Sequence, residues 1–371
     1  MNKALKSAFQ SFLNVTVNGS TFPEILATAI DATLTESKDS AAAERHIEGY
    51  LALLGYVHER DVFVELSRAK LAKRLLCTTA DIQLEQNVLG RIKYSLGNNL
   101  TEKLEGMLRD CDASRGIEAQ FLTNRLANNL PCGFTCDMLT GAHWPSYKVD
   151  VLRPLESLRQ CIAAFETFYH IWQPRRKLFW MHSLGSSTLS ISFPKGLREI
   201  TCSTYQAATL MFIDMHGKAT PKMIAENLNL DLNAGVKPHV TFLLTRVPIL
   251  NCIGYTGKID DDSSLELNQT FHSQHHKLKL PRANTSTSRE GVAEMTHVEA
   301  QRNVQMTASV VRIMKTHRSL ATDELVNLTI QDLSKNFVPQ RSAIKERIRN
   351  LVQREYLRYH PDDCAKVEYI A

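Results

Sequence analysis

The first part of the chain repeats apolar side chains at the spacing of amphipathic helices. Leu84, Val88, Ile92 and Leu96 recur at every fourth residue and therefore share one face of a helix. Similar stripes continue to about residue 125, with short polar stretches between them. Because helices joined by short connectors pack as antiparallel neighbours, we predict a helical bundle over residues 1–128.

After about residue 130 the pattern changes to the alternation that is typical of strands. Phe134, Cys136 and Met138 alternate with their neighbours, and residues 178–181 form a short apolar run. Between them, residues 152–172 have a helical pattern. We therefore predict a small mixed sheet with helical cover, and the candidate strands are Phe134–Leu139, Leu178–Leu184 and Leu189–Phe193.

The last part of the chain has the pattern helix, helix, helix and short strands twice. The first copy, a winged-helix arrangement, spans about 204–280, and Thr220-Pro221 marks one of its helix starts. The predicted fold is α+β and mainly helical. Its expected domains are the bundle at 1–128, an α/β region with the first winged helix at 129–281, a weakly ordered linker at 282–300 and a winged-helix module at 301–371.

Composition is that of an ordinary globular protein, with 43% hydrophobic and 22% charged residues among 371. No apolar run approaches the roughly 20 residues that a membrane-spanning helix needs. The N-terminus has the pattern of an amphipathic helix and not of a signal peptide. We therefore expect a protein of the cytoplasm, the nucleus or both, without a membrane partner.

Candidate metal and catalytic residues are few. Of the eight cysteines only Cys132 and Cys136 are close in sequence, and no second Cys or His pair lies at zinc spacing. His275 and His276 are adjacent and would point to opposite faces of a strand. No metalloprotease, serine-hydrolase or phosphate-binding motif occurs. We expect reduced, mostly buried thiols, no metal, no cofactor and no catalytic residues.

The positive charge is concentrated at the C-terminal end, where residues 301–371 carry 12 Lys and Arg against 8 Asp and Glu. A winged helix with a basic third helix is a common reader of nucleic acid, although a solvated helix face has the same composition. The residues in question are Arg341, Lys345, Arg347, Arg349, Arg354 and Arg358. A second basic run comprises Arg68, Lys70, Lys73 and Arg74.

Several short blocks, taken in order, resemble the C-terminal half of a cullin. The last module contains Val310-Val311-Arg312-Ile313-Met314-Lys315, and the chain ends Tyr369-Ile370-Ala371. The other blocks are Lys70-Leu71-Ala72-Lys73-Arg74-Leu75-Leu76, Lys103-Leu104-Glu105-Gly106-Met107, His143-Trp144-Pro145-Ser146-Tyr147-Lys148, Ser203-Thr204-Tyr205-Gln206, Ile344-Lys345-Glu346-Arg347-Ile348 and Arg354-Glu355-Tyr356-Leu357. The resemblance implies a non-catalytic scaffold of a ubiquitin ligase, with the fold already predicted from periodicity.

Lys315 is the modification site that the resemblance implies. Val310, Ile313, Met314 and His317 form the stripe that should pack into the module, which leaves Lys315 on a solvent face. In cullins the matching lysine accepts a ubiquitin-like modifier, a reaction called neddylation. By spacing alone Lys315 is an ordinary surface lysine.

The resemblance also implies binding of a RING-box zinc protein, which cullins hold by taking one of its strands into their own sheet. The candidate contact residues are Phe134, Cys136, Met138, Trp144, Leu178, Trp180, Leu189 and Ile191. For Trp144 and Trp180 an ordinary place in the core is the alternative.

Further partners follow from the same resemblance. A ubiquitin-conjugating enzyme would bind through the RING, cullin regulators would act on the last module, and acidic partners would dock on Arg68, Lys70, Lys73, Arg74, Arg341, Lys345 and Arg347. The chain begins where the adaptor-binding stalk of a cullin ends, so no substrate adaptor is expected to bind it. Two other interpretations remain: a winged-helix protein that binds nucleic acid, and a decoy cullin fragment without the stalk. The resemblance to cullins disfavours the first.

Overall fold

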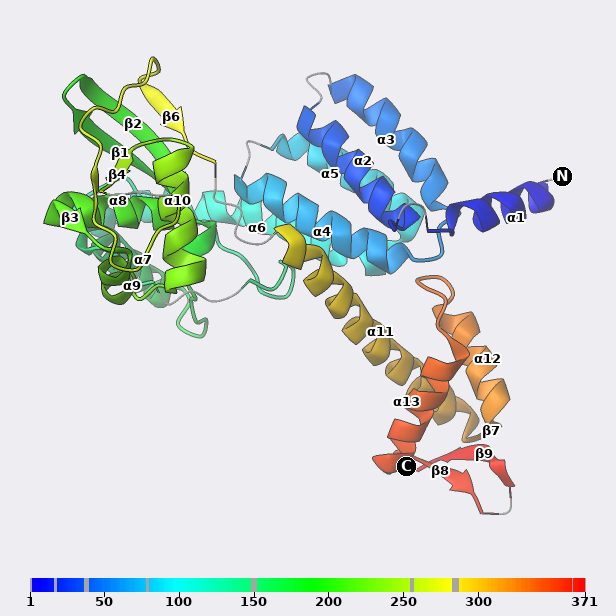
Figure 1. Ribbon diagram of the computed structural model, residues 1–371. Helices are drawn as coiled ribbons and strands as arrows, with labels where there is room; N and C mark the ends of the chain where they lie inside the picture. Colours follow the sequence, from blue (N-terminus) through cyan, green and yellow to red (C-terminus); the bar gives the residue numbers. More distant parts are fainter. Residues whose placement is uncertain are drawn as a thin grey trace. The chain divides into compact units, whose positions relative to one another are not determined.

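The fold is α+β and mainly helical, as predicted, in two compact units (Figure 1). The computed structural model describes residues 2–16, 19–36, 40–77, 80–147, 152–253, 257–281, 287–361 and 363–370. The first unit comprises Met1–Arg109, Leu139–Pro145 and Ser288–Ala371, and the second comprises Asp110–Met138 and Ser146–Thr287. The predicted bundle and the C-terminal module thus belong largely to one unit.

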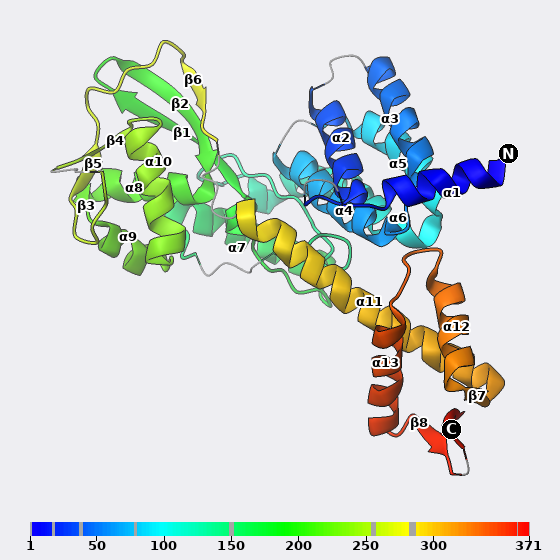
Figure 2. The same cartoon turned by 45° about the vertical axis from the view of Figure 1, so that its right-hand side comes forward.

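The predicted helical bundle is present, and α2 to α6 lie side by side in both views, whereas α1 extends away from them toward the N-terminus (Figure 1, Figure 2). Its helices are α1 (Asn2–Leu13), α2 (Phe22–Glu36), α3 (Ser40–Leu54), α4 (Arg60–Cys77), α5 (Ile82–Leu96) and α6 (Asn98–Leu122). Asp81 caps α5 by accepting from the amides of Gln83 and Leu84, and Gly97 ends it at φ 84°, a conformation that glycine adopts without strain. The apolar stripes meet in a core that includes Ile47, Phe63, Leu104 and Met107.

The second unit combines a three-stranded sheet with the first winged helix. Strand β1 (Ser186–Phe193) pairs antiparallel with β2 (Gly196–Ser203), and β6 (Lys277–Lys279) pairs parallel with β2, so the strand order is β1-β2-β6. The winged helix consists of α8 (Thr204–His216), β3 (Lys218–Ala219), α9 (Pro221–Leu228), the π-helix η3 (Leu232–Val236), α10 (Lys237–Thr245), β4 (Leu250–Cys252) and β5 (Leu265–Leu267). The predicted start at Thr220-Pro221 is confirmed, because Thr220 accepts from the Met223 amide.

Two of the three predicted strands are wrong. Phe134–Leu139 and Leu178–Leu184 belong to no strand of the structure, and the second segment ends in the 3₁₀ turn η2 (His182–Leu184). Burial nevertheless alternates along residues 134–138, as the sequence pattern indicated. The burial of side chains can alternate along a segment that is not a strand. A strand also requires hydrogen bonds to a neighbouring strand, and none pairs with this segment among the described residues. The third prediction is confirmed by β1, and the predicted helix is α7 (Glu156–Trp172).

The C-terminal module repeats the order of the first winged helix. It consists of α11 (Thr287–His317), β7 (Ser319–Ala321), α12 (Thr322–Leu333), α13 (Arg341–Gln353), β8 (Leu357–His360) and β9 (Asp363–Tyr369), with strand order β7-β9-β8. In both views α12 and α13 pack near the C-terminal end of α11 (Figure 1, Figure 2). Their core contains Val310, Met314, Leu325, Ile344 and Ile348.

The expected linker is a helix over most of its length. Residues 282–286 lie outside the described part of the chain, but Thr287–Ala300 form the first half of α11. Val298 in this stretch is buried, which gives the helix an apolar contact. The run of Ser, Thr and Asn that indicated a linker extends into α11 only at Thr287 and Ser288, and the prediction for residues 287–300 is wrong.

Acidification is expected to destabilise the second unit through His239 on α10. The side chain is 5% exposed, its Nδ1 has no hydrogen-bond partner, and burial lowers its pKa from 6.5 to about 4. Such a histidine takes up its proton only on unfolding, so its stabilisation is complete above pH 6.5 and is lost as the pH falls toward 4. Between pH 7 and pH 5 the free energy of unfolding should fall by about 2 kcal/mol.

The measurement is urea unfolding of the wild type and of His239→Phe at both pH values. Phenylalanine keeps an apolar ring beside Tyr205, whose ring centroid lies 5.5 Å from that of His239. The variant should lose about 2 kcal/mol less on acidification than the wild type. Equal losses would mean that His239 does not contribute this pH dependence.

Candidate modification and partner-binding sites

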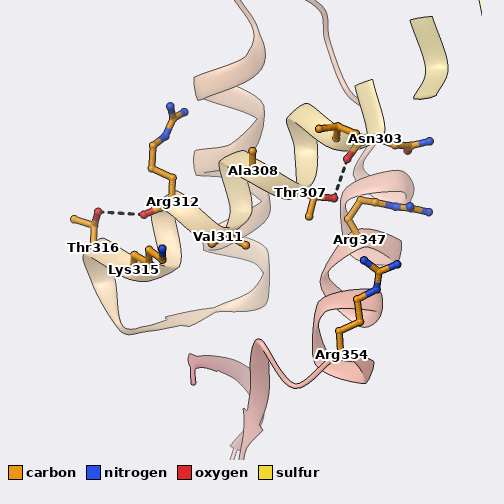
Figure 3. A pocket seen from close by; sticks show the side chains of 10 residues that line it. Asn303, Thr307, Ala308, Val311, Arg312, Lys315, Thr316, Arg347 and Arg354 are labelled. Carbon is orange, nitrogen blue, oxygen red and sulfur yellow. Dashed lines mark hydrogen bonds between the residues drawn. The ribbon is translucent and has the colours of Figure 1, made fainter. Parts of the chain in front are cut away.

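Lys315 lies on the last turn of α11 and its side chain is exposed. The predicted stripe is confirmed at Val310 and Met314, which are fully buried, but it is wrong for His317, which is exposed at the end of the helix. Its Nζ lies 6.0 Å from the ring centroid of Tyr369, and no ion pair to a carboxylate is present among the described residues. The neighbouring Arg312, by contrast, is ion-paired with Asp332. The Lys315 amine is therefore accessible from solvent, as an acceptor of a bulky modifier requires (Figure 3).

A free sheet edge lies at β1, the outer strand of the order β1-β2-β6. Leu189 and Ile191 point inward and pack against the winged-helix core, whereas Ser190 and Ser192 are exposed. Within the described residues no strand pairs with the outer edge of β1. Such an edge presents unpaired amides and carbonyls and can accept a strand from another chain.

The two extended segments that are not strands converge on one aromatic cluster. Phe121, Phe165, Phe168 and Tyr169, from α6 and α7, form its buried centre. The predicted contact residues that pack on it are Phe134, Cys136, Met138, Leu178 and Trp180. The Phe134 and Trp180 ring centroids are 6.2 Å apart, and the Trp180 indole donates to Glu166 at 2.7 Å. The structure thus brings five of the eight predicted residues together and places Leu189 and Ile191 on a different core.

Sequence reasoning missed apolar side chains that surround this cluster and face solvent. Phe179 is 68% exposed between the half-buried Leu178 and Trp180, and Ile171 and Trp172 are exposed at the end of α7. Exposed large apolar groups beside an unpaired segment are typical of an interaction surface. The continuous apolar run at 178–181 gave no signal for this, because only the structure shows that burial alternates and leaves Phe179 exposed.

Trp144 is a core residue and not an interface anchor. It is 3% exposed and belongs to the first unit, apart from the other predicted contact residues. Arg68 donates to the carbonyl oxygens of His143 and Trp144 at 3.3 Å each. Gly106 permits this packing, because a Cβ at that position would lie 2.3 Å from the His143 ring. The expectation for Trp144 is therefore corrected: its own chain already covers it.

The basic run on α4 is divided between the interior and the surface. Arg68 and Arg74 are buried and paired with Glu65 at 2.5 Å and with Glu85 at 2.6 Å. Lys70 lies 3.7 Å from Asp31, and Lys73 is exposed. Arg68 and Arg74 are thus unavailable to an acidic partner, because buried carboxylates already neutralise them. The docking prediction for these two arginines is wrong.

The basic residues of α13 also have acidic neighbours. Arg341 and Lys345 lie 3.8 Å and 3.0 Å from the same Asp323 carboxylate, and the hydrogen bond from Lys345 and its charge hold the pKa of Asp323 below its usual value. Arg347 is 2.7 Å from Glu346. The positive potential of this helix is therefore lower than its sequence indicates, which weakens the case for a nucleic-acid surface.

Sequence reasoning also missed an ion cluster within the first unit. Arg302 of α11 donates to both oxygens of Asp61 at 2.5 and 2.8 Å and lies 3.3 Å from Glu59. Its guanidinium also lies 4.8 Å from the Phe337 ring centroid. No sequence signal marks this cluster, because Arg302 and Asp61 are 241 positions apart.

Metal and membrane sites were searched in the same part of the chain. Among the described residues, no group of three or more His, Cys, Asp or Glu side chains is arranged to hold a metal ion. Nor does any described helix combine the length and apolar character that crossing a membrane requires.

Comparison with known proteins identifies the family. Residues 1–118 match the cullin alpha solenoid domain, residues 138–271 the cullin alpha+beta domain, and residues 301–363 the cullin protein neddylation domain. Cullin-1 of Oryza sativa subsp. japonica is 32% identical over 379 residues, covering 100% of this chain and 50% of that protein. Cullin-2 of Arabidopsis thaliana is 32% identical over 100% of this chain and 51% of its own length. Putative cullin-like protein 1 of the same plant is 30% identical over 100% of this chain and 49% of its own length. The chain spans about half the length of these curated relatives, and it belongs to the cullin family.

Proposed function

We propose that this chain is a non-catalytic scaffold of a cullin-RING ubiquitin ligase. It binds a RING-box zinc protein and, through it, a ubiquitin-conjugating enzyme, and it accepts a ubiquitin-like modifier on Lys315. The observation that carries the proposal is the combination of a free β1 edge with an aromatic cluster whose covering segments have no strand partner. The neddylation-domain match supports the acceptor role, because its range 301–363 contains Lys315.

The RING-box protein would bind by strand addition. A strand from the partner would complete the ladder on the outer edge of β1, and main-chain hydrogen bonds would supply most of the affinity. Alternate side chains of that strand would set the register, and exposed apolar groups such as Phe179 would bury further area.

The scaffold would accelerate ubiquitin transfer through proximity. Holding a charged conjugating enzyme near a substrate raises the effective concentration of the thioester and requires no acid or base from this chain. The family matches fall within the proposed domains at 1–128, 129–281 and 301–371, so each part keeps a separate role. Regulators of cullins would act on the last of these, beside Lys315.

Co-expression with a RING-box protein tests the proposal. We expect the two chains to co-purify in a 1:1 complex, and we expect Ser190→Pro to abolish it. Proline removes an amide from β1, and edge strands tolerate it better than central strands do. The matched control is Ser190→Ala, which keeps the amide and should bind as the wild type does. Failure of the wild type to bind, or binding by Ser190→Pro, would contradict strand addition at β1.

A further inference from the structure

A groove of about 800 Å³ lies between α11 and the C-terminal part of α13 (Figure 3). We infer that this groove is a docking site for an acidic amphipathic helix of a partner protein. The inference rests on the shape and charge of the groove, and it does not depend on the proposed roles of Lys315 or of the RING-box protein.

The floor of the groove is a second apolar stripe on α11. Val304, Ala308 and Val311 follow at i, i+4 and i+7, on the side of the helix away from the buried Val310 and Met314. Val304 is 68% exposed and Ala308 is exposed as well. Val311 is partly buried and packs against the core of the module, so the unpartnered apolar surface of this stripe is Val304 and Ala308.

The walls of the groove are cationic. Of the residues that the structure describes, its lining contains Arg312, Lys315, Arg347 and Arg354 and no acidic residue. Arg347 and Arg354 are seven positions apart, two turns along the same side of α13 and its C-cap, and Figure 3 shows both beside the groove. Within the described residues, no carboxylate pairs with Lys315 or Arg354. The charge of the groove therefore matches a partner that carries several carboxylates.

Arg347 provides an independent indication of a missing acceptor. Its Nε is buried and has no hydrogen-bond partner, although one Nη donates to Glu346 at 2.7 Å. An unsatisfied buried donor is costly, and a carboxylate in the groove would satisfy it once the Arg347 side chain shifts to expose its Nε. The hydroxyl groups in the lining are already satisfied, because Thr307 donates to the Asn303 carbonyl at 2.8 Å and Thr316 to the Arg312 carbonyl at 3.2 Å. Because Arg312 is paired with Asp332 and Arg347 with Glu346, Lys315 and Arg354 are the cations of the lining left to bind a ligand.

The apolar floor distinguishes a peptide from a nucleic acid. Phosphate groups would pair with the arginines but would leave Val304, Ala308 and Val311 against a charged backbone. An amphipathic helix places apolar side chains on the floor and carboxylates against the walls in the same step, which is the helix-in-groove mode of recognition.

Fluorescence anisotropy with the full chain tests the inference. The probe is a fluorescein-labelled synthetic helix with one leucine stripe flanked by glutamates, and its control is a scrambled peptide of identical composition. We expect the designed helix to bind roughly tenfold more tightly than the scrambled peptide, since one lost charge-assisted contact or apolar anchor changes the binding constant by about that factor. Equal affinities would overturn the inference.

Variants of the chain then locate the site. Val304→Asp and Arg354→Glu should each weaken binding of the designed helix roughly tenfold or more. The matched control is Arg349→Glu, which changes the same charge on an exposed residue of α13 that does not line the groove, and it should bind as the wild type does. A loss with Arg349→Glu equal to that with Arg354→Glu would reduce the effect to general attraction and overturn the inference. Tighter binding of a double-stranded DNA oligonucleotide, lost in Arg354→Glu, would assign the groove to nucleic acid instead.

Discussion

Replacing Lys315 by arginine is expected to abolish the attachment of a ubiquitin-like modifier to this chain. An acceptor amine attacks the thioester only after it has lost its proton. A guanidinium stays protonated at any physiological pH and is not a nucleophile, whereas it preserves the positive charge. Because Lys315 is exposed at the end of α11, the substitution should leave the fold unchanged. The expected result is complete loss of the modified band.

The measurement is co-expression with a RING-box protein and the conjugation enzymes of the modifier, followed by mass spectrometry of the isopeptide-linked peptide. Lys335→Arg is the matched control, since Lys335 is also exposed on the C-terminal module and should be dispensable. A band that persists in Lys315→Arg would place the acceptor elsewhere. A wild-type complex with the RING-box protein but without a band would remove the acceptor role and leave the binding role intact.

Replacing Arg74 by methionine is expected to cost about 3–5 kcal/mol of unfolding free energy, because it leaves a buried carboxylate unpaired. Arg74 joins three helices of the bundle: Nε and Nη2 donate to Glu85 of α5 at 2.6 and 2.9 Å, and Nη1 donates to Asp31 of α2 at 2.5 Å. Burial by itself lowers the pKa of Arg74, but the hydrogen bonds and charges of Glu85 and Asp31 outweigh it and raise that pKa above its ordinary value. The arginine therefore stays charged inside the bundle.

Urea unfolding of three variants tests this account. Lys73→Met, next to Arg74 but exposed, should change the free energy of unfolding by no more than about 0.5 kcal/mol. Arg74→Met combined with Glu85→Leu should recover a large part of the loss, because no buried charge is then left without its partner. A loss below about 1 kcal/mol for Arg74→Met would show that water or rearrangement satisfies Glu85. No recovery in the double variant would show that the arginine acts through packing instead.

Local periodicity predicted the helices of the bundle and strand β1 correctly. The stripe Leu84, Val88, Ile92 and Leu96 lies on α5, and the alternation of Leu189 and Ile191 lies on β1. The repeated order of the two winged helices was also visible, because each copy buries its own apolar faces. These predictions succeed because side chains four residues apart in a helix, or two apart in a strand, face the same way whatever the rest of the chain does.

Contacts between residues far apart in sequence could not be predicted from local periodicity. Phe134 and Leu178 alternate with their neighbours like strand residues, but a strand also needs a partner, and local periodicity cannot report whether one is present. Arg68 and Arg74 have the sequence context of a surface run, yet Glu65 and Glu85 make them interior residues. The groove that Val304 and Arg354 line exists only because α13 packs across α11.

The sequence by itself determined the family, the mainly helical α+β class, the two winged helices and the exposure of Lys315. Each of these depends on residue order or on short-range periodicity, which the chain carries in every environment. Only the tertiary structure decided which charges are neutralised, that Trp144 is covered, that β1 has a free edge and that α11 has a second apolar face beside unpaired cations. The physical reason is that burial and ion pairing depend on segments far apart in sequence meeting in space, which no local pattern records.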